Sequence, residues 1–448
     1  MHRTHRQRVL DLLEDGDLAL VPAARPVLRN HDVEHPFRQS SDFLYLTGFR
    51  EHDAVLMLAK GIDELPDETM FVLPRDAAQE TWTGRRCGPQ GVVEQLGFEA
   101  ADSLDDLDDR VGDALAHARR VWLRLGERPE LDRLVLARLG ELREQSRRED
   151  CHSPGSIHDP SGLLAELRLR KSAEELAWMR LAAAATAEGH LLAMAQAAPG
   201  VGEWELEALL NYTFRRRGGD GWAYPPIVAG GVNACILHYT ESAARLGTGD
   251  LVLVDAGAEF AGYASDVTRT FPVDGSFAPA QRDAYEVVLA AQEAGIAAVQ
   301  PGKPFQDVHA AATRALAEGL RALGVLSEPI DAILERQLYR PWYMHSTSHW
   351  LGLDVHDAGR YRSDGVSRPL EEGMVLTVEP GLYFRPDDER VPAALRGLGI
   401  RIEDDVLVTG GGHEVLSAAV PKRIDEVEAA CSAVRVMPPT LESELAIK

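Results

Sequence analysis

The sequence predicts an α+β protein of two domains, and three observations support this fold class. The chain has 448 residues, and at roughly 100 to 200 residues per domain this length corresponds to two or three domains. Aliphatic, strand-like segments lie in two blocks on either side of an Ala-rich helical stretch from Arg282 to Leu323. A Pro-, Gly- and Ser-rich segment over residues 151–162 is typical of a linker.

We place the first domain at residues 1–160 and the second at 165–448. The first mixes short apolar runs with helical patches, which indicates a smaller α/β domain. The second opens with Ser172-Ala173-Glu174-Glu175, a capping box that predicts a helix ending before Pro199. Its predicted strands are Leu251–Ala258, Ser265–Val273, Met374–Glu379 and Gly399–Val408.

Charge and composition exclude several classes of function. The formal net charge of -24 repels polyphosphates, so we expect no nucleic-acid partner. No stretch approaches the roughly 18 uninterrupted apolar residues of a membrane span, so we expect no membrane partner. The four cysteines stand far apart without a C-x-x-C pair, which argues against a disulfide framework and favours the reducing cytoplasm.

The most informative segment runs from Leu251 to Phe271 and resembles a hairpin that turns near residues 260–262. A tight turn there would place Asp255 opposite Asp266, with side chains about 4.5 to 5.5 Å apart on one face. Two carboxylates so placed repel each other unless a cation lies between them, and they suit a pair of divalent ions. The alternative is that each Asp ends a strand or caps a turn.

Three further side chains are candidate metal ligands. His349 follows His345-Ser346-Thr347-Ser348, and Glu379 and Glu403 each follow a β-type run whose alternation would bury them. A lone ionised carboxylate is costly to bury and tends to find a cation. Four carboxylates and one imidazole form an oxygen-dominated set that suits manganese or a similar divalent ion better than a thiolate zinc site.

These segments resemble, in order and spacing, the motifs of the pita-bread metallopeptidases, and most closely the Xaa-Pro aminopeptidases. The resemblance covers about residues 165–425. A weaker similarity to the family's amino-terminal domain is carried by residues 41–49 and 80–86. The matching motifs of the second domain are Val254-Asp255-Ala256-Gly257, Ser265-Asp266-Val267-Thr268-Arg269-Thr270, His345 to Asp357, Val378-Glu379-Pro380-Gly381 and Arg401-Ile402-Glu403-Asp404.

The resemblance implies a carboxy-terminal pita-bread (creatinase/aminopeptidase-like) catalytic domain. It also implies a smaller creatinase-like amino-terminal domain with a role in oligomer assembly or substrate access. Two divalent ions, with Mn²⁺ the expected metal, are implied as cofactors, and Asp266 and Glu403 are implied to bridge them. The full implied ligand set is Asp255, Asp266, His349, Glu379 and Glu403.

Further roles are implied for residues around this set. Ser346 stands where the family usually has Gly, and its side chain would narrow the cleft. Trp82 would reach the active site of a neighbouring subunit in a family-like oligomer. Without the resemblance, its residue type alone predicts a core position. The implied catalytic residues are His238, His345, His356, Glu379 and Arg401. The implied substrate-binding residues are His238, His345, His356, Tyr383 and Trp82.

The expected function is hydrolysis of the amino-terminal Xaa-Pro bond of peptides by a water that two metal ions activate. The expected assembly is a homodimer or homotetramer. One alternative is prolidase, which shares these ligands but cleaves only Xaa-Pro dipeptides. From another class, the chain would be a non-catalytic pita-bread binding protein or a metal-free creatinase-like hydrolase, but those relatives lose ligands that this sequence keeps.

Overall fold

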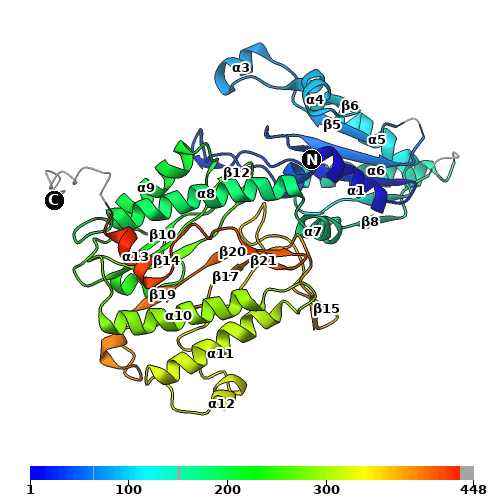
Figure 1. Cartoon of the computed structure of the whole chain (residues 1–448). Helices are drawn as coiled ribbons and strands as arrows, with labels where there is room; N and C mark the ends of the chain where they lie inside the picture. The colour runs from blue at the N-terminus through cyan, green and yellow to red at the C-terminus, as the bar shows by residue number, and fades with distance from the viewer. Residues whose placement is uncertain (64, 149–151, 434–448) are drawn as a thin grey trace. The chain divides into compact units, whose positions relative to one another are not determined.

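The chain folds into two compact units in the computed structural model, which describes residues 1–63, 65–148 and 152–433 (Figure 1). The first unit is Met1–Arg168 and the second begins at Leu169. Helix α7 (Ser161–Leu169) ends at this boundary. None of the helices within the described ranges has the length and apolar character needed to cross a bilayer.

The first unit is built on a six-stranded mixed sheet with the order β6-β5-β4-β1-β7-β8. Every residue of the central strand β1 is buried, because helices cover this sheet and its apolar runs form the core. The strands are β1 (Asp17–Pro22), β4 (Val55–Lys60), β5 (Glu68–Val72), β6 (Ala100–Ser103), β7 (Arg120–Trp122) and β8 (Ser156–His158), with a separate hairpin of β2 (Leu28–Asn30) and β3 (Val33–Glu34). The helices are α1 (His2–Leu12), α2 (Ser41–Thr47), α3 (Ala77–Thr83), α4 (Gly88–Leu96), α5 (Leu107–His117) and α6 (Pro129–Gln145).

Part of the segment expected to be a linker is a strand of this sheet. Ser156–His158 forms β8, which pairs parallel to β7 at the sheet edge. Ile157 packs against the apolar core of the first unit, and this burial draws the segment onto the sheet. The chain therefore passes from the first unit to the second after residues 151–162, between Arg168 and Leu169.

The second unit places small sheets between two layers of helices (Figure 1). Apolar side chains of α8, α9 and α10 pack against β11 and β14 in one large core. The helices are α8 (Ala173–Gln196), α9 (Glu203–Arg216), α10 (Pro279–Ala298), α11 (Gln306–Ala322), α12 (Ile330–Glu335) and α13 (Ile424–Cys431). The strands are β9 (Gly221–Trp222), β10 (Ile227–Gly230), β11 (Leu251–Asp255), β12 (Ala258–Phe260), β13 (Tyr263–Ala264), β14 (Thr268–Pro272), β15 (Arg362–Ser363), β16 (Val366–Ser367), β17 (Val375–Val378), β18 (Gly381–Tyr383), β19 (Gly399–Arg401), β20 (Asp404–Thr409) and β21 (Gly412–Val415).

The two helix predictions for the second unit are confirmed, except that one predicted stretch forms two helices. Ser172 caps α8, because its Oγ accepts a hydrogen bond from the Glu175 amide at 3.3 Å and the Glu175 carboxylate accepts one from the Ser172 amide at 2.7 Å. The Ala-rich stretch from Arg282 to Leu323 is two helices, α10 and α11, rather than one. Pro301 and Gly302, which has a φ of +81°, turn the chain between them.

The hairpin that carries the two aspartates turns where the sequence indicated, but its register differs from the expectation. Ala261 and Gly262 both have positive φ and make a two-residue turn that pairs Phe260 with Tyr263. Continued along the arms, this register places Thr268 opposite Asp255. The expectation of a direct Asp255–Asp266 pair is therefore wrong, since Asp266 lies in the gap between β13 and β14.

A close backbone approach at Gly257 fixes this hairpin. A Cβ at Gly257 would lie 1.6 Å from the Ser265 carbonyl oxygen, a main-chain atom that cannot move aside. The absence of a side chain at Gly257 therefore allows the main chains of the two hairpin arms to approach closely at Ser265, next to Asp266.

We predict that Gly257→Ala lowers the free energy of unfolding by about 3 kcal/mol or more, because the added methyl overlaps the backbone. Gly411→Ala is the matched control, since a Cβ there meets nothing within 4 Å. It should change stability by less than about 0.5 kcal/mol. Urea unfolding of both variants provides the measurement. Equal stability of the two would contradict the close approach of Gly257 to the Ser265 carbonyl.

Candidate active site

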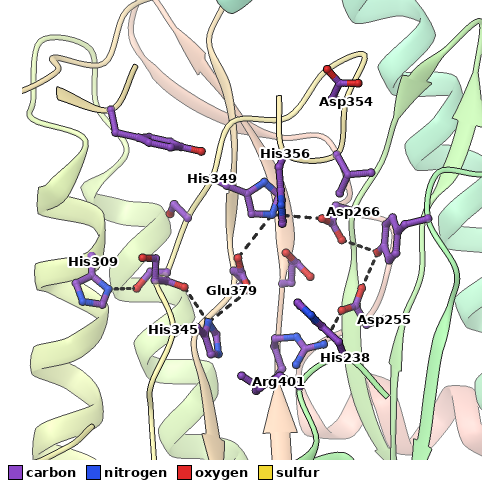
Figure 2. A pocket seen from close by; sticks show the side chains of 18 of the residues that line it. His238, Asp255, Asp266, His309, His345, His349, Asp354, His356, Glu379 and Arg401 are labelled. Carbon is purple, nitrogen blue, oxygen red and sulfur yellow. Dashed lines mark hydrogen bonds and ion pairs between the residues drawn. The ribbon is translucent and has the colours of Figure 1, made fainter. Parts of the chain in front are cut away.

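A cavity of about 1120 Å³ lies in the second unit and gathers the candidate residues (Figure 2). They come from the ends of β11, β17 and β19 and from the loops before β11, β14, β15 and β20. The candidate residues in its wall are Asp255, Asp266, His349, Glu379, Glu403, His238, His345, His356 and Arg401. Residues far apart in the sequence thus face one space.

Asp255 and Asp266 meet at a tyrosine that the sequence did not indicate. The Tyr224 hydroxyl lies 2.6 Å from Asp255 Oδ1 and 2.5 Å from Asp266 Oδ1. The main chain of Asp266 is fixed separately, because its amide donates to Asp405 Oδ1 at 3.0 Å. The pairing of β10 with β11 explains the position of Tyr224. Ile227 of β10 pairs with Asp255 of β11, so the loop before β10, which carries Tyr224, lies beside the Asp255 carboxylate.

His349 presents one nitrogen to the carboxylates. Its Nδ1 lies 3.0 Å from the Trp350 carbonyl oxygen, which can only accept, so Nδ1 carries the proton. Nε2 then faces Asp266 Oδ2 at 3.4 Å and Glu379 Oε1 at 3.6 Å. Glu403 completes the group, and its Oε2 accepts a hydrogen bond from Thr268 Oγ1 at 2.6 Å.

The electrostatics of this group favour a divalent cation. One ligand atom each from Asp266, His349 and Glu403 lies within 4.8 Å of the others. Burial raises the pKa of Glu379 to about 7 and the pKa of Glu403 well above its usual range, and neighbouring carboxylates add to both shifts. Burial also raises the pKa of Asp255, against the opposing charge of Arg401. Buried carboxylates that lie this close together and have raised pKa values are stabilised in their charged form by a bound cation, so this group fits a cation site.

His349 supplies part of that charge when its ring is protonated. Burial acts to lower its pKa, but Asp266 and Glu379 outweigh burial and raise it to about 9. Conversely, burial acts to raise the pKa of Asp266, but the hydrogen bond and charge of His349 hold it below its usual range. Nε2 faces these carboxylates and is therefore the ring nitrogen that would either hold a proton or bind a metal ion.

Tyr383, behind the cavity wall, joins Arg401 and His345 of the wall in a hydrogen-bonded chain. Arg401 pairs with Asp255 at 2.5 Å and donates to the Tyr383 hydroxyl at 3.0 Å. His345 Nδ1 lies 2.8 Å from the Ser346 carbonyl, so Nδ1 is the donor and Nε2 accepts from the Tyr383 hydroxyl at 2.9 Å. Burial lowers the pKa of His345 to about 4, which keeps the ring neutral.

Two buried acidic residues hold the loops that carry the other histidines. Glu203 accepts hydrogen bonds from the Tyr239 hydroxyl at 2.8 Å and the Ala244 amide at 2.7 Å, which fixes the loop of His238. Asp357 pairs with Lys171 at 2.9 Å, and both side chains are 1% exposed. His356 precedes Asp357, and its ring contacts that of His349 with centroids 4.3 Å apart.

Two predicted substrate-binding residues lie outside the cavity wall. Tyr383 is 1% exposed and supports His345 and Arg401 from behind, because its hydroxyl is engaged by both. Trp82 lies on α3 of the first unit and is 86% exposed, so it is not the core residue that it would be by composition alone. Ser346 does line the cavity, where its side chain takes up space beside His345.

Comparison with known proteins decides the family. Residues 177–410 match the family model described as metallopeptidase family M24. The chain belongs to this family. Residues 2–122 of this M24 metallopeptidase match the aminopeptidase P, N-terminal domain. The predicted family, the α+β fold with a pita-bread unit and the predicted enzyme class, a metallopeptidase-type hydrolase, are thereby confirmed.

Relatives of this M24 metallopeptidase match it over nearly its whole length. The Xaa-Pro aminopeptidase of Escherichia coli (strain K12) is 43% identical, covering 96% of this chain and 97% of that protein. The Xaa-Pro aminopeptidase 3 of Mus musculus is 34% identical, covering 90% and 78%. Among solved structures, Pseudomonas aeruginosa aminopeptidase PepP matches with a TM-score of 0.94, 42% identity and coverage of 96% and 97%. A zinc-substituted E. coli aminopeptidase P in complex with product matches with a TM-score of 0.92, 42% identity and the same coverage.

We predict that Tyr224→Phe weakens the binding of divalent metal by tenfold or more, a typical cost of losing a group that orients metal ligands. The phenyl ring keeps the packing but no longer ties Asp255 to Asp266. Titration calorimetry with Mn²⁺ measures the change. Tyr212→Phe is the matched control, because Tyr212 is 61% exposed on α9. Equal affinities in the two variants would show that Tyr224 has no part in arranging the ligands.

Proposed function

We propose that this chain is a metal-dependent Xaa-Pro aminopeptidase, which hydrolyses the bond between the first residue of a peptide and a following proline. The observation that carries the proposal is the convergence of all five predicted metal ligands and of the predicted catalytic histidines His238, His345 and His356 on one cavity. The relatives named Xaa-Pro aminopeptidase support the same activity.

We assign the metal to the carboxylate-rich end of the cavity. The residues that would hold two divalent ions are Asp255, Asp266, His349, Glu379 and Glu403, and Asp266 and Glu403 would each serve both ions. The oxygen-dominated donor set favours Mn²⁺. Ions held there would lower the pKa of a bound water and polarise the substrate carbonyl.

The side chains of the cavity then divide the remaining work. Glu379 takes the proton of the attacking water, because its carboxylate lines the cavity and burial raises its pKa to about 7, which suits a general base at neutral pH. His238 and His356, both exposed to the cavity, donate hydrogen bonds to the developing oxyanion and the leaving nitrogen. One such donor contributes about 3 kcal/mol to transition-state stabilisation.

Asp255 orients the free amino group of the substrate, which makes the reaction that of an aminopeptidase. Arg401 holds this carboxylate in place and balances its charge. Proline lacks an amide hydrogen and fixes φ, so a site that recognises peptides by backbone hydrogen bonds loses one partner there. A wall of histidines around the ring compensates, with His345 held by Tyr383.

The volume of the cavity is compatible with peptides longer than dipeptides. Pockets for drug-sized ligands span about 300 to 1,000 Å³, and this cavity of about 1120 Å³ exceeds that range. Space therefore remains for residues beyond the proline. Prolidase, which cleaves Xaa-Pro dipeptides, is the alternative with the same ligands.

Assembly and location complete the proposal. The chain acts as a homodimer or homotetramer in which the first unit controls substrate access. Trp82 contributes to substrate binding from a neighbouring subunit, and its 86% exposure in this chain supports such a role. A cytoplasmic location is supported by Cys87, Cys235 and Cys431, which are all free thiols.

The test of the function compares peptide lengths. With Mn²⁺ added after chelation, we expect kcat/KM for an Xaa-Pro-Xaa tripeptide to exceed that for the matching Xaa-Pro dipeptide by about tenfold or more, because the cavity binds the third residue as well. Liquid chromatography of the products gives both rates. A strong preference for the dipeptide would identify a prolidase, and no cleavage of either with any divalent metal would refute the proposal.

A second experiment tests the ligand assignment. We predict that Asp266→Asn reduces kcat to below about one-hundredth of the wild-type value. The fold should stay intact, with cooperative thermal unfolding in chelator, because asparagine keeps the size of the side chain. Asp283→Asn, on the exposed face of α10, is the control and should keep full activity. An Asp266→Asn enzyme with wild-type turnover would contradict the assignment.

A further inference from the structure

One histidine in the cavity wall, His309, belongs to none of the motifs that build the metal centre. It lies on α11, on the side of the cavity away from Asp255 and His238 (Figure 2). No sequence pattern connects this helix with the segment that carries His345 and His349. The connection appears only in the folded chain.

His309 contacts that segment through a buried threonine. Its Nδ1 lies 2.8 Å from Thr347 Oγ1, and the same hydroxyl lies 2.5 Å from the Tyr343 phenol. Thr347 is 0% exposed and Tyr343 is 1% exposed, so no water competes for these hydrogen bonds. The other ring nitrogen of His309 makes only a longer contact, 3.4 Å from Thr313 Oγ1.

The position of Thr347 makes this contact important for the site. Its carbonyl accepts a hydrogen bond of 2.8 Å from the amide of Glu379, and it stands two residues from both His345 and His349. The adjacent Ser348 does not help to hold the segment, because its buried hydroxyl has no hydrogen-bond partner in the described part of the chain. Anchoring the Thr347 side chain therefore fixes the main chain that presents three active-site groups.

We propose that His309 is a positioning residue, which acts through Thr347 to fix the main chain that presents His345, His349 and Glu379. The inference deepens the proposed function and rests on it for its catalytic consequence. Without the imidazole, Thr347 keeps Tyr343 as its partner but loses its anchor to α11. The segment then gains freedom at His349 and Glu379, which are metal ligands, and at His345.

The first experiment uses the full chain with His309→Ala. We expect kcat to fall about tenfold and the affinity for Mn²⁺ to weaken by about three- to tenfold, the scale of effects from groups that orient metal ligands. KM should rise by less than kcat falls, because the loops of His238 and His356 are held by other anchors. His309→Asn should recover most of kcat, because the amide of Asn places a polar atom where Nδ1 stood.

A double-mutant cycle shows whether His309 acts through Thr347. Thr347→Val keeps the shape of the side chain and removes the hydroxyl, and thermal unfolding checks that each variant is folded. If the pathway is correct, His309→Ala combined with Thr347→Val lowers kcat no further than the stronger single variant. Thr313→Val is the control, which removes only the longer contact and should leave kcat within twofold.

The outcomes separate this inference from the proposed function. Wild-type kcat and Mn²⁺ affinity in folded His309→Ala, or fully additive losses in the double variant, would overturn the inference. Mn²⁺ titration needs no turnover, so weakened binding in His309→Ala supports the inference even if the wild-type chain cleaves no Xaa-Pro peptide. That last result would refute the proposed function alone.

Discussion

The crowding of four carboxylates in one buried cavity is the constraint on which the second unit depends. Burial makes each of these groups harder to ionise, and their mutual repulsion adds to that cost. Within the described residues, the positive charges in contact with them are those of Arg401 and the protonated His349. A chain that keeps such a cluster does so for binding cations, which agrees with its membership of a metallopeptidase family.

Much of the polar interior can be understood as support for this cluster. Tyr224 ties the two aspartates together, Thr268 holds Glu403, and Asp405 fixes the main chain of Asp266. Three of the cavity histidines also have buried anchors of their own. Glu203 fixes the loop of His238, Asp357 that of His356 and Tyr383 the ring of His345. Because these anchors are separate, a change at one leaves the others in place.

The sequence was sufficient where the information is local. Each of these signals depends on residues that are close together in the sequence. They are the capping box of α8, the runs that form the strands, and the motifs around Asp255, His349 and Glu403. The family resemblance adds the roles of these motifs. Tyr224 and His309 had no such signal, because the first depends on the register of β10 with β11 and the second on how α11 packs. The register error at Asp266 has the same origin: two residues along a strand decide which side chain faces which.

The ion pair between Lys171 and Asp357 limits where the catalytic unit can be separated from the rest of the chain. Lys171 lies only two residues beyond Leu169, the start of the second unit, yet its ammonium group neutralises a carboxylate beside His356. A fragment that begins a few residues later would keep every strand and helix from α8 onward but leave that buried carboxylate without its cation. Removing one partner of a buried pair costs about 3 to 5 kcal/mol. The first turn of the chain after the boundary is thus part of the active-site scaffold.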